Sequence, residues 1–341
     1  MLANLLRTSD DSIQHHVCTM LADEVFFDLG GRLSAGPTRS RRASLGIVRH
    51  LLHTASWFRP NVVHGWMYHA NLATLLLRRQ TGSIVWSIHS SGLLPGFSQV
   101  RTMLVDKALA KLSRRIPARI VYVTEQSRKA HEAVGYAANK SVVIPNGIDL
   151  ARFDPGRFPS RREGAGLSRP VVVAMVARVH PEKGHDVLIE ALSDHPLKDR
   201  IELVLVGRGV DTDRSIAARL DAAGLLGRSR LLGEVARIED VYASADIVVL
   251  PSYAEGLPLT LLEAMAMGCL IVASRVGEIP QIGLDPDLLF EPGDRQGCQR
   301  ALAEAVERLP VAAAELRDTI ARRYDLKQVA ARYSALYREI A

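Results

Sequence analysis

The sequence predicts an α/β protein with two doubly wound domains, each a parallel sheet covered by helices. Short apolar runs alternate with amphipathic stretches along nearly the whole chain, which is typical of strands alternating with helices. The 341 residues are enough for two domains of about 150 residues each. A composition of 48% apolar and 23% charged residues excludes a disordered chain.

The first domain is expected over residues 1–150, and its opening departs from the usual pattern. A doubly wound domain normally starts with a strand that leads into a glycine-rich turn, whereas residues 1–7 already have a helical pattern. We therefore expect the first strand and its glycine-rich loop to be missing, the start to lie too far downstream, or the sheet to be built differently. The predicted strands are 61–64, 84–89, 119–123 and 141–144.

Residues 100–115 predict an amphipathic helix with a basic side. One stripe is apolar and another collects positive charge. The apolar stripe comprises Val100, Met103, Leu104, Ala108 and Leu112, and the basic side Lys107, Lys111, Arg114 and Arg115.

The positive charge belongs to the first half of the chain. Residues 1–150 carry 18 Lys and Arg against 9 Asp and Glu, whereas residues 151–341 carry 25 against 28. Such a bias favours an anionic partner, either a phosphate-bearing substrate or a membrane surface at its inner face. Nucleic acid is disfavoured, because no motif of a known reader module is present and aromatic residues do not alternate with the basic ones.

The second domain is expected over residues 151–325, after the turn-rich segment 154–170. Its predicted strands are 170–176, 201–206, 230–232, 246–250 and 269–273. The chain is helical in pattern from residue 311 onward, and residues 326–341 are expected to form a helix that packs back towards the first domain.

The cysteines and the apolar runs predict a cytoplasmic protein. Cys18, Cys269 and Cys298 have neither disulfide nor metal spacing, which indicates a reducing compartment. The longest apolar run, 257–273, is interrupted by Pro258 and Glu263, and no signal-peptide pattern opens the chain.

Two cations follow the predicted strand 170–176, in the segment Ala-Arg-Val-His-Pro-Glu-Lys-Gly from 177 to 184. Ligands of open α/β sheets bind at the carboxyl ends of strands. Arg178 and Lys183 are therefore expected to enter a crevice, where they could straddle a diphosphate.

A second segment, Glu255-Gly-Leu-Pro-Leu-Thr-Leu-Leu-Glu263, follows the strand that ends at residue 250. Pro258 suits the first position of a helix, so the backbone N–H groups of residues 259–261 form a predicted anion site. Glu255 and Glu263 are expected to accept hydrogen bonds from hydroxyl groups. Glu263 lies among apolar neighbours and needs a partner.

These two segments, together with Val-Ile-Pro-Asn-Gly-Ile-Asp at 143–149, resemble glycosyltransferase family 4, the retaining enzymes of the GT-B fold. The resemblance implies two Rossmann-like domains facing a cleft, and a donor site in the second domain. It assigns Arg178 and Lys183 to the donor diphosphate, Glu263 to the ribose and Glu255 to the transferred sugar. Further donor contacts are expected from Gly207, Gly209, Gly256, Leu257 and Leu259, and His89 resembles the family's active-site histidine.

The predicted activity is that of a retaining, Leloir-type glycosyltransferase. It would move a sugar from a nucleotide-diphosphate sugar to an acceptor hydroxyl, in the synthesis of cell-surface polysaccharide or glycolipid. No cofactor or metal is expected: the remaining histidines show no coordinating arrangement, and Asp211-Thr-Asp213 is expected to cap a helix.

Two alternative functions belong to other classes of protein. The missing first strand and loop suggest a nucleotide-sugar-binding protein with impaired catalysis. A dinucleotide-dependent oxidoreductase would share the architecture, but no Gly-x-Gly-x-x-Gly follows a first strand. Residues 146–149 predict either a plain turn, with Gly147 at positive φ, or a segment that positions the domains.

Overall fold

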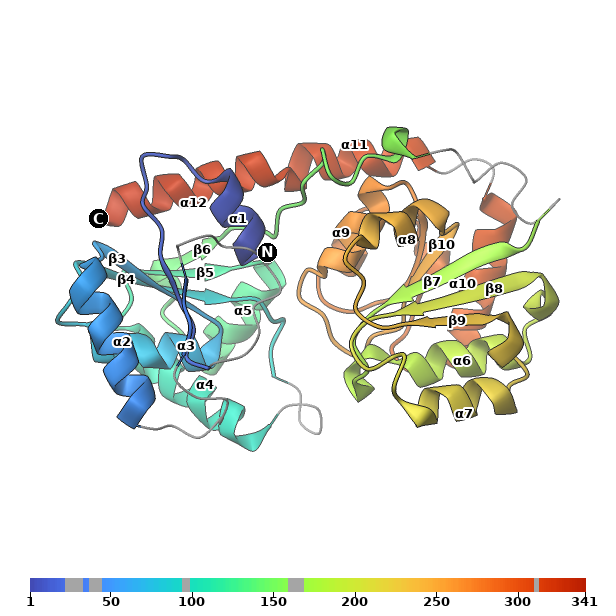
Figure 1. Ribbon diagram of the computed structural model, residues 1–341, viewed down its shortest axis with the longest axis horizontal. Helices are drawn as coiled ribbons and strands as arrows, with labels where there is room; N and C mark the ends of the chain where they lie inside the picture. The colour runs from blue at the N-terminus through green and yellow to red at the C-terminus, as the bar shows by residue number, and fades with distance from the viewer. Residues whose placement is uncertain (22–32, 37–44, 94–98, 159–168, 310–312) are drawn as a thin grey trace. The chain divides into compact units, whose positions relative to one another are not determined.

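The computed structural model describes residues 1–21, 33–36, 45–93, 99–158, 169–309 and 313–341. They form two compact units, which Figure 1 labels by element. The first unit comprises Met1–Gly147 and Leu326–Ala341, and the second comprises Ile148–Asp325. The border thus falls after Gly147 rather than after residue 150, and the last 16 residues belong to the first unit. The middle of the turn-rich segment, 159–168, lies outside the described residues.

A four-stranded parallel sheet forms the centre of the first unit, in the order β3-β4-β5-β6. All four strands predicted for this unit are present, with ends shifted by one or two residues. The strands are β3 (Val62–Trp66), β4 (Ser83–Ile88), β5 (Arg119–Tyr122) and β6 (Ser141–Val143).

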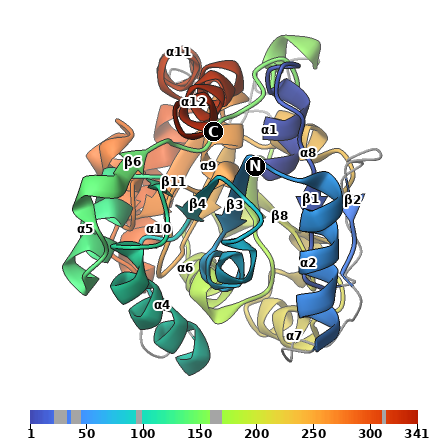
Figure 2. The same cartoon turned by 90° about the vertical axis from the view of Figure 1, so that its left-hand side faces the viewer.

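Alternate residues of β4 face opposite sides of this sheet, as the strand period of two requires. Ile84, Trp86 and Ile88 pack with residues of α3 (Tyr68–Ala73) and α4 (Val100–Ser113). Val85 packs on the other face with α1 (Leu2–Thr8) and α12 (Leu326–Ile340). Figures 1 and 2 show α1 beside α12. The helix α5 (Glu125–Val134) follows β5, and α2 (Leu45–Phe58) packs on the 3-10 turn Thr74–Leu77.

The opening of the chain is helical, as predicted, because α1 begins at Leu2. Two short strands that the sequence did not predict, β1 (Val17–Cys18) and β2 (Leu33–Ser34), pair in parallel with each other and do not join the central sheet.

The apolar stripe of the predicted basic helix is not its buried face. The helix α4 buries Asp106, Leu109, Ala110 and Ser113, whereas Val100 and Leu104 of the apolar stripe are 72% and 62% exposed. Tyr136 explains the buried carboxylate, because its hydroxyl donates to Asp106 Oδ1 at 2.7 Å. A polar residue with a partner thus occupies the inner face, and apolar side chains remain on the outside beside Lys107 and Lys111.

The second unit contains a six-stranded parallel sheet in the order β12-β11-β10-β7-β8-β9. Five of these strands were predicted, and the missed one, β12, has only two residues. The strands are β7 (Val171–Val176), β8 (Ile201–Val206), β9 (Ser229–Leu232), β10 (Ile247–Leu250), β11 (Leu270–Ser274) and β12 (Leu289–Phe290).

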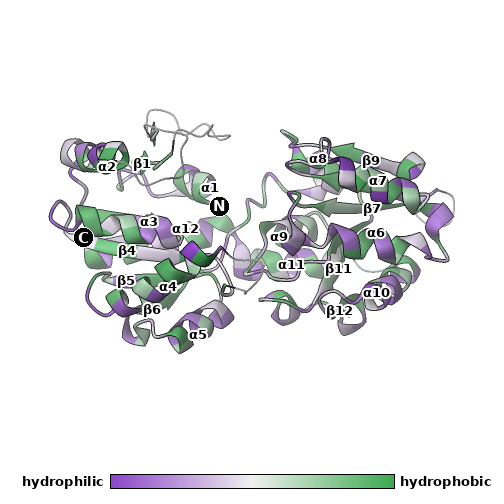
Figure 3. Cartoon of the chain, turned by 90° about the horizontal axis from the view of Figure 1, so that it is seen from below, coloured by the Kyte–Doolittle hydropathy of each residue, from purple (hydrophilic) through white to green (hydrophobic). Residues whose placement is uncertain are grey.

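Helices cover both faces of this sheet (Figure 1). On one side lie α6 (His185–Ser193), α7 (Arg214–Ala222) and α10 (Arg295–Arg308); on the other lie α8 (Ile238–Ser244), α9 (Leu259–Ala266) and α11 (Ala313–Tyr324). Every residue of β10 and β11 is buried, which explains their continuous apolar runs. Figure 3 shows hydrophobic and hydrophilic residues alternating along the helices. None of the described helices combines the length and apolarity needed to cross a bilayer.

Candidate functional site

A cavity of about 500 Å³ lies at the carboxyl ends of β7, β8 and β10 in the second unit. In the sheet, β7 and β10 are neighbours; β8 and β9 follow outward from β7, and β11 and β12 follow outward from β10 in the opposite direction. The cavity therefore lies where the strand order reverses, which is the usual ligand position in an open parallel sheet. Of the predicted site residues, Arg178, Lys183, Gly207, Glu255 and Leu259 line it.

The centre of this cavity is an ion pair between two predicted site residues. Lys183 Nζ lies 2.7 Å from Glu255 Oε1, and the Ser252 hydroxyl donates to the same oxygen at 2.7 Å. An ammonium group has three donors, and Glu255 is the one hydrogen-bond partner of the Lys183 ammonium group in the part of the chain that the structure describes, so two N–H bonds are available to a ligand. Within the described residues Glu255 Oε2 accepts no hydrogen bond, and it is available to a ligand hydroxyl.

The cations of the cavity outnumber its carboxylates. Arg178 is exposed and forms no ion pair with any residue that the structure describes. Arg208 pairs with Glu234 at 3.1 Å, and both also line the cavity. Three cations thus face two carboxylates, and the excess positive charge favours an anionic ligand.

The first turn of α9 adds a further positive end. The helix begins at Leu259, and Pro258 is its N-cap with an extended ψ of 131°. The prediction that Pro258 is the first helical residue is therefore wrong by one position. The consequence for binding is unchanged, because no side chain caps this end and the first backbone N–H groups of a helix have no partner within it. Pro258, Leu259 and Thr260 line the cavity.

Two glycines allow the loops of the site to approach each other. Gly184 has φ +70°, and a Cβ there would lie 2.0 Å from the Pro251 carbonyl oxygen. Gly207 has φ +140°, and its Cβ would lie 2.3 Å from the Ala177 oxygen. Only glycine fits at either position. Gly184 thereby brings Lys183 against the loop that carries Glu255.

Four predicted donor residues do not line this cavity: Gly209, Gly256, Leu257 and Glu263. Leu257 is buried, and the Gly256 carbonyl accepts a hydrogen bond from the Glu278 N–H group at 3.0 Å. The partner expected for Glu263 exists, because the Tyr242 hydroxyl donates to Oε2 at 2.8 Å. Burial raises the pKa of the Glu263 carboxyl, and the Tyr242 hydrogen bond opposes that shift.

His89 lies in the first unit, directly after β4. Its ring stacks on Trp66, with centroids 4.8 Å apart and planes at 22°. Its Nδ1 lies 3.2 Å from Asn146 Oδ1. Burial lowers the pKa of His89 to about 4, so the ring is neutral at pH 7.

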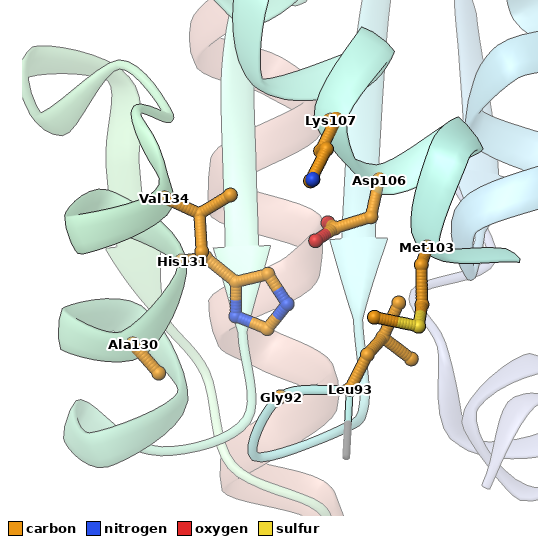
Figure 4. Close-up of a pocket in the computed structure, with 8 residues that line it drawn as sticks. All are labelled: Gly92, Leu93, Met103, Asp106, Lys107, Ala130, His131 and Val134. Atoms are coloured by element: carbon orange, nitrogen blue, oxygen red, sulfur yellow. The ribbon is translucent and has the colours of Figure 1, made fainter. Parts of the chain in front are cut away.

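A second cavity lies in the first unit between α4 and α5 (Figure 4). Its volume is about 150 Å³, and Leu93, Met103 and Val134 form its apolar walls. The polar groups of its floor bond to the protein itself. Asp106 accepts from Tyr136 at 2.7 Å, and His131 Nε2 lies 2.8 Å from the Tyr68 hydroxyl.

Sequence reasoning missed three polar residues of the donor cavity. Arg208 lies two residues after the end of β8, Glu234 two residues after the end of β9, and Ser252 two residues after the end of β10. Their position just after a strand is a usable signal in a parallel sheet. This signal is weak by itself, because every strand is followed by loop residues and most of them bind no ligand.

The acidic tripeptide 211–213 has the capping role that the sequence predicts. Asp213 is the N-cap of α7, and its Oδ1 accepts from the Ser215 N–H group at 2.8 Å. Across the described ranges no three His, Cys, Asp or Glu side chains cluster closely enough to hold a metal ion.

Two family models match consecutive parts of the chain. The model of Glycosyltransferase Family 4 matches residues 2–152, and that of Glycosyl transferases group 1 matches residues 170–309.

Curated relatives include D-inositol 3-phosphate glycosyltransferases. The protein from Geodermatophilus obscurus is 26% identical over 302 residues, which cover 84% of this chain and 63% of the relative. The one from Segniliparus rotundus is 27% identical over 267 residues, or 72% of this chain and 57% of the relative. The chain thus spans about three fifths of the length of these relatives.

Two solved structures illustrate the fold that this chain shares with other proteins. Anabaena HepE in complex with UDP and glucose superposes with a TM-score of 0.75 at 21% identity, covering 89% of this chain and 85% of that one. The lipopolysaccharide outer core galactosyltransferase WaaB superposes with a TM-score of 0.68 at 18% identity, covering 99% of this chain and 94% of that one.

Proposed function

Since the chain belongs to the glycosyltransferases of family 4 and group 1 and has the GT-B fold, we propose that it transfers a sugar from a nucleotide-diphosphate sugar to an acceptor hydroxyl with retention at the anomeric carbon. The observation that carries this proposal is the convergence of Arg178, Lys183 and the start of α9 on one cavity of the second unit. HepE, a structural neighbour, was solved with UDP-glucose bound, which supports a nucleotide sugar as donor.

The chemical step builds negative charge on the leaving diphosphate. The bond between the anomeric carbon and the phosphate oxygen breaks, and its electron pair stays on that oxygen. The acceptor oxygen forms the new glycosidic bond and releases its proton. Arg178, the two remaining N–H bonds of Lys183 and the N-terminus of α9 would stabilise the developing charge without reorganisation.

Glu255 has two tasks in this proposal. Oε1 accepts hydrogen bonds from both the Lys183 ammonium group and the Ser252 hydroxyl. The ammonium group is therefore positioned before the donor binds. Oε2 would accept a hydrogen bond from a hydroxyl of the transferred sugar. Glu263, whose Oε2 accepts a hydrogen bond from the buried Tyr242, would bind the ribose hydroxyls, and no metal takes part.

The variant Lys183→Ala tests the proposal. We expect it to fold and to lose about 100-fold or more in kcat, because one donor to the leaving charge is removed. Product release is followed as acceptor-dependent formation of nucleoside diphosphate, over a panel of donors with lipid-linked and soluble acceptors. Lys198→Ala is the matched control, since Lys198 lies outside the cavity lining.

Full transfer by folded Lys183→Ala would contradict this assignment. A protein that only binds nucleotide sugars gives a different result, namely donor binding with no diphosphate release that depends on acceptor or on Glu255. Retention is checked separately by the anomeric configuration of the product in NMR spectra.

We also propose that the first unit binds the acceptor and contacts an anionic membrane surface from the cytoplasmic side, as synthesis of glycolipid or cell-surface polysaccharide would require. The support is the exposed Val100 and Leu104 of α4 beside exposed Lys107 and Lys111. Co-sedimentation with anionic vesicles tests this contact.

A further inference from the structure

The ring of His89 is held by Trp66 and Asn146. Trp66 stacks on its face at 4.8 Å, and Asn146 Oδ1 lies 3.2 Å from Nδ1. Nε2 is buried and has no hydrogen-bond partner among the described residues. A buried polar atom without a partner is costly, so an unpaired nitrogen beside a fully engaged one requires an explanation.

The chemistry of Asn146 determines the state of that nitrogen. An amide oxygen only accepts hydrogen bonds, so Nδ1 must carry the proton. A neutral imidazole has one N–H group, so Nε2 has a lone pair and acts as an acceptor.

The neutral form is the relevant one. Burial lowers the pKa of His89 to about 4; the Asn146 hydrogen bond opposes this shift and the positive amino terminus adds to it. His64, Tyr333 and Tyr337 are further titratable groups of this cluster. Burial lowers the pKa of His64 to about 3 and raises the pKa of both tyrosines, so all three are neutral at pH 7.

Asn146 is itself fixed by the packing of its neighbour. It is 7% exposed, and the next residue, Gly147, lies against α12. A Cβ at Gly147 would be 2.9 Å from Leu326 Cα. The expected positive φ at Gly147 is absent, so this glycine is required for close approach and not for a turn.

We infer that Asn146 is a positioning residue, which holds His89 as the Nδ1–H tautomer so that Nε2 presents a lone pair to a hydroxyl group of a bound substrate. The inference rests on the proposed function for the identity of that hydroxyl, which belongs to the sugar or to the acceptor. It excludes a carbonyl oxygen and the oxygens of a diphosphate diester as the partner of Nε2, because these groups have no hydrogen to donate.

The tautomer is measured directly with ¹⁵N-labelled histidine and two-bond ¹⁵N–¹H NMR correlation at pH 7. We expect His89 Nε2 to have a pyridine-type shift and Nδ1 a pyrrole-type shift. Asn146→Asp keeps an acceptor oxygen, so it should retain this tautomer and raise the pKa of His89. Asn146→Leu removes the acceptor and should give a mixture of tautomers. A pyridine-type Nδ1 in the wild-type protein, or no change in Asn146→Leu, would overturn the inference.

Kinetics test whether Asn146 acts through His89. Asn146→Leu and His89→Ala should each lower kcat/KM about 10-fold, the effect expected for loss of one hydrogen bond. Asn146→Asp keeps the acceptor oxygen, so above pH 7 it should have most of the wild-type kcat/KM. The double variant should be no worse than His89→Ala alone. Additive losses would overturn the inference, and Asn139→Leu, at an exposed asparagine, is the control. Absence of transfer in the wild-type protein as well as in every variant would contradict the proposed function while leaving the NMR result intact.

Discussion

At the scale of single residues, the donor cavity depends on pairs that no sequence spacing reveals. Lys183 and Glu255 are 72 positions apart, yet their side chains meet at 2.7 Å. The sequence predicted both as donor ligands, each acting alone. The structure shows that Glu255 holds Lys183 in place and that the Ser252 hydroxyl donates to the same Glu255 oxygen, so a change at Glu255 also affects the cation.

The same scale gives a prediction for Gly184. We expect Gly184→Ala to destabilise the second unit by more than 1 kcal/mol, because it combines a left-handed backbone with a Cβ 2.0 Å from the Pro251 oxygen. Donor affinity, measured by calorimetry, should fall as well, because the loops that carry Lys183 and Glu255 must separate.

Gly283→Ala is the matched control for this prediction. Gly283 also has a positive φ, of +96°, but no atom within 4 Å of its Cβ position. It should cost only the backbone strain of about 1 kcal/mol and leave donor binding intact. Equal effects of the two substitutions on donor affinity would refute the role given to close approach.

At the scale of elements, periodicity predicted the strands well, whereas the apolar stripe of α4 does not coincide with its buried face. The apolar spacing of Val100 and Leu104 suits a buried stripe, but the buried face of α4 holds Asp106 and Ser113. These two side chains have partners elsewhere in the first unit: Asp106 binds Tyr136, and the Ser113 hydroxyl accepts from the Ala137 N–H group. Hydrogen-bond partners that are distant in sequence thus place a polar face of α4 inside, although the local apolar spacing favours the opposite face.

The outward face of α4 predicts lipid binding. At low salt the protein should pellet with phosphatidylglycerol vesicles and not with phosphatidylcholine vesicles. Lys111→Glu combined with Arg115→Glu should abolish pelleting, since each basic residue near such a surface contributes about 1 kcal/mol. Arg214→Glu, at an exposed residue of the second unit, is the control. No lipid-dependent pelleting at low salt would exclude this contact.

At the scale of the whole molecule, the chain crosses from the first unit to the second and returns. Its last helix, α12, packs Val329 and Tyr333 against the sheet of the first unit. His64 lies in this contact, with Nδ1 2.7 Å from the Tyr337 hydroxyl and Nε2 2.6 Å from the Ser87 hydroxyl. The return of the chain therefore encloses a neutral histidine.

This enclosure predicts that the first unit is sensitive to acid. Burial lowers the pKa of His64 to about 3 and that of His89 to about 4, whereas an unfolded histidine titrates near 6.5. Between about pH 6.5 and pH 4 the unfolded state binds more protons. Stability is therefore full above about pH 6.5 and decreases as the pH falls, by up to about 1.4 kcal/mol per pH unit for each group.

Tryptophan fluorescence measures this effect in the first unit alone, because all three tryptophans, Trp57, Trp66 and Trp86, lie there. His64→Gln should flatten the pH dependence of denaturant unfolding between pH 7 and pH 5, and His53→Gln, at an exposed histidine, should not. An unchanged slope in His64→Gln would contradict the prediction.

The sequence by itself determined the strands, the two-unit α/β organisation and the segments that approach a donor, because burial on both faces of a parallel sheet and helix starts at strand ends leave local patterns. Only the tertiary structure decided which predicted residues line one cavity, that Glu255 holds Lys183, and that Asn146 contacts His89. It also decided which side of α4 is buried. These contacts join residues far apart in the chain, and their geometry depends on how the elements pack rather than on spacing along the sequence.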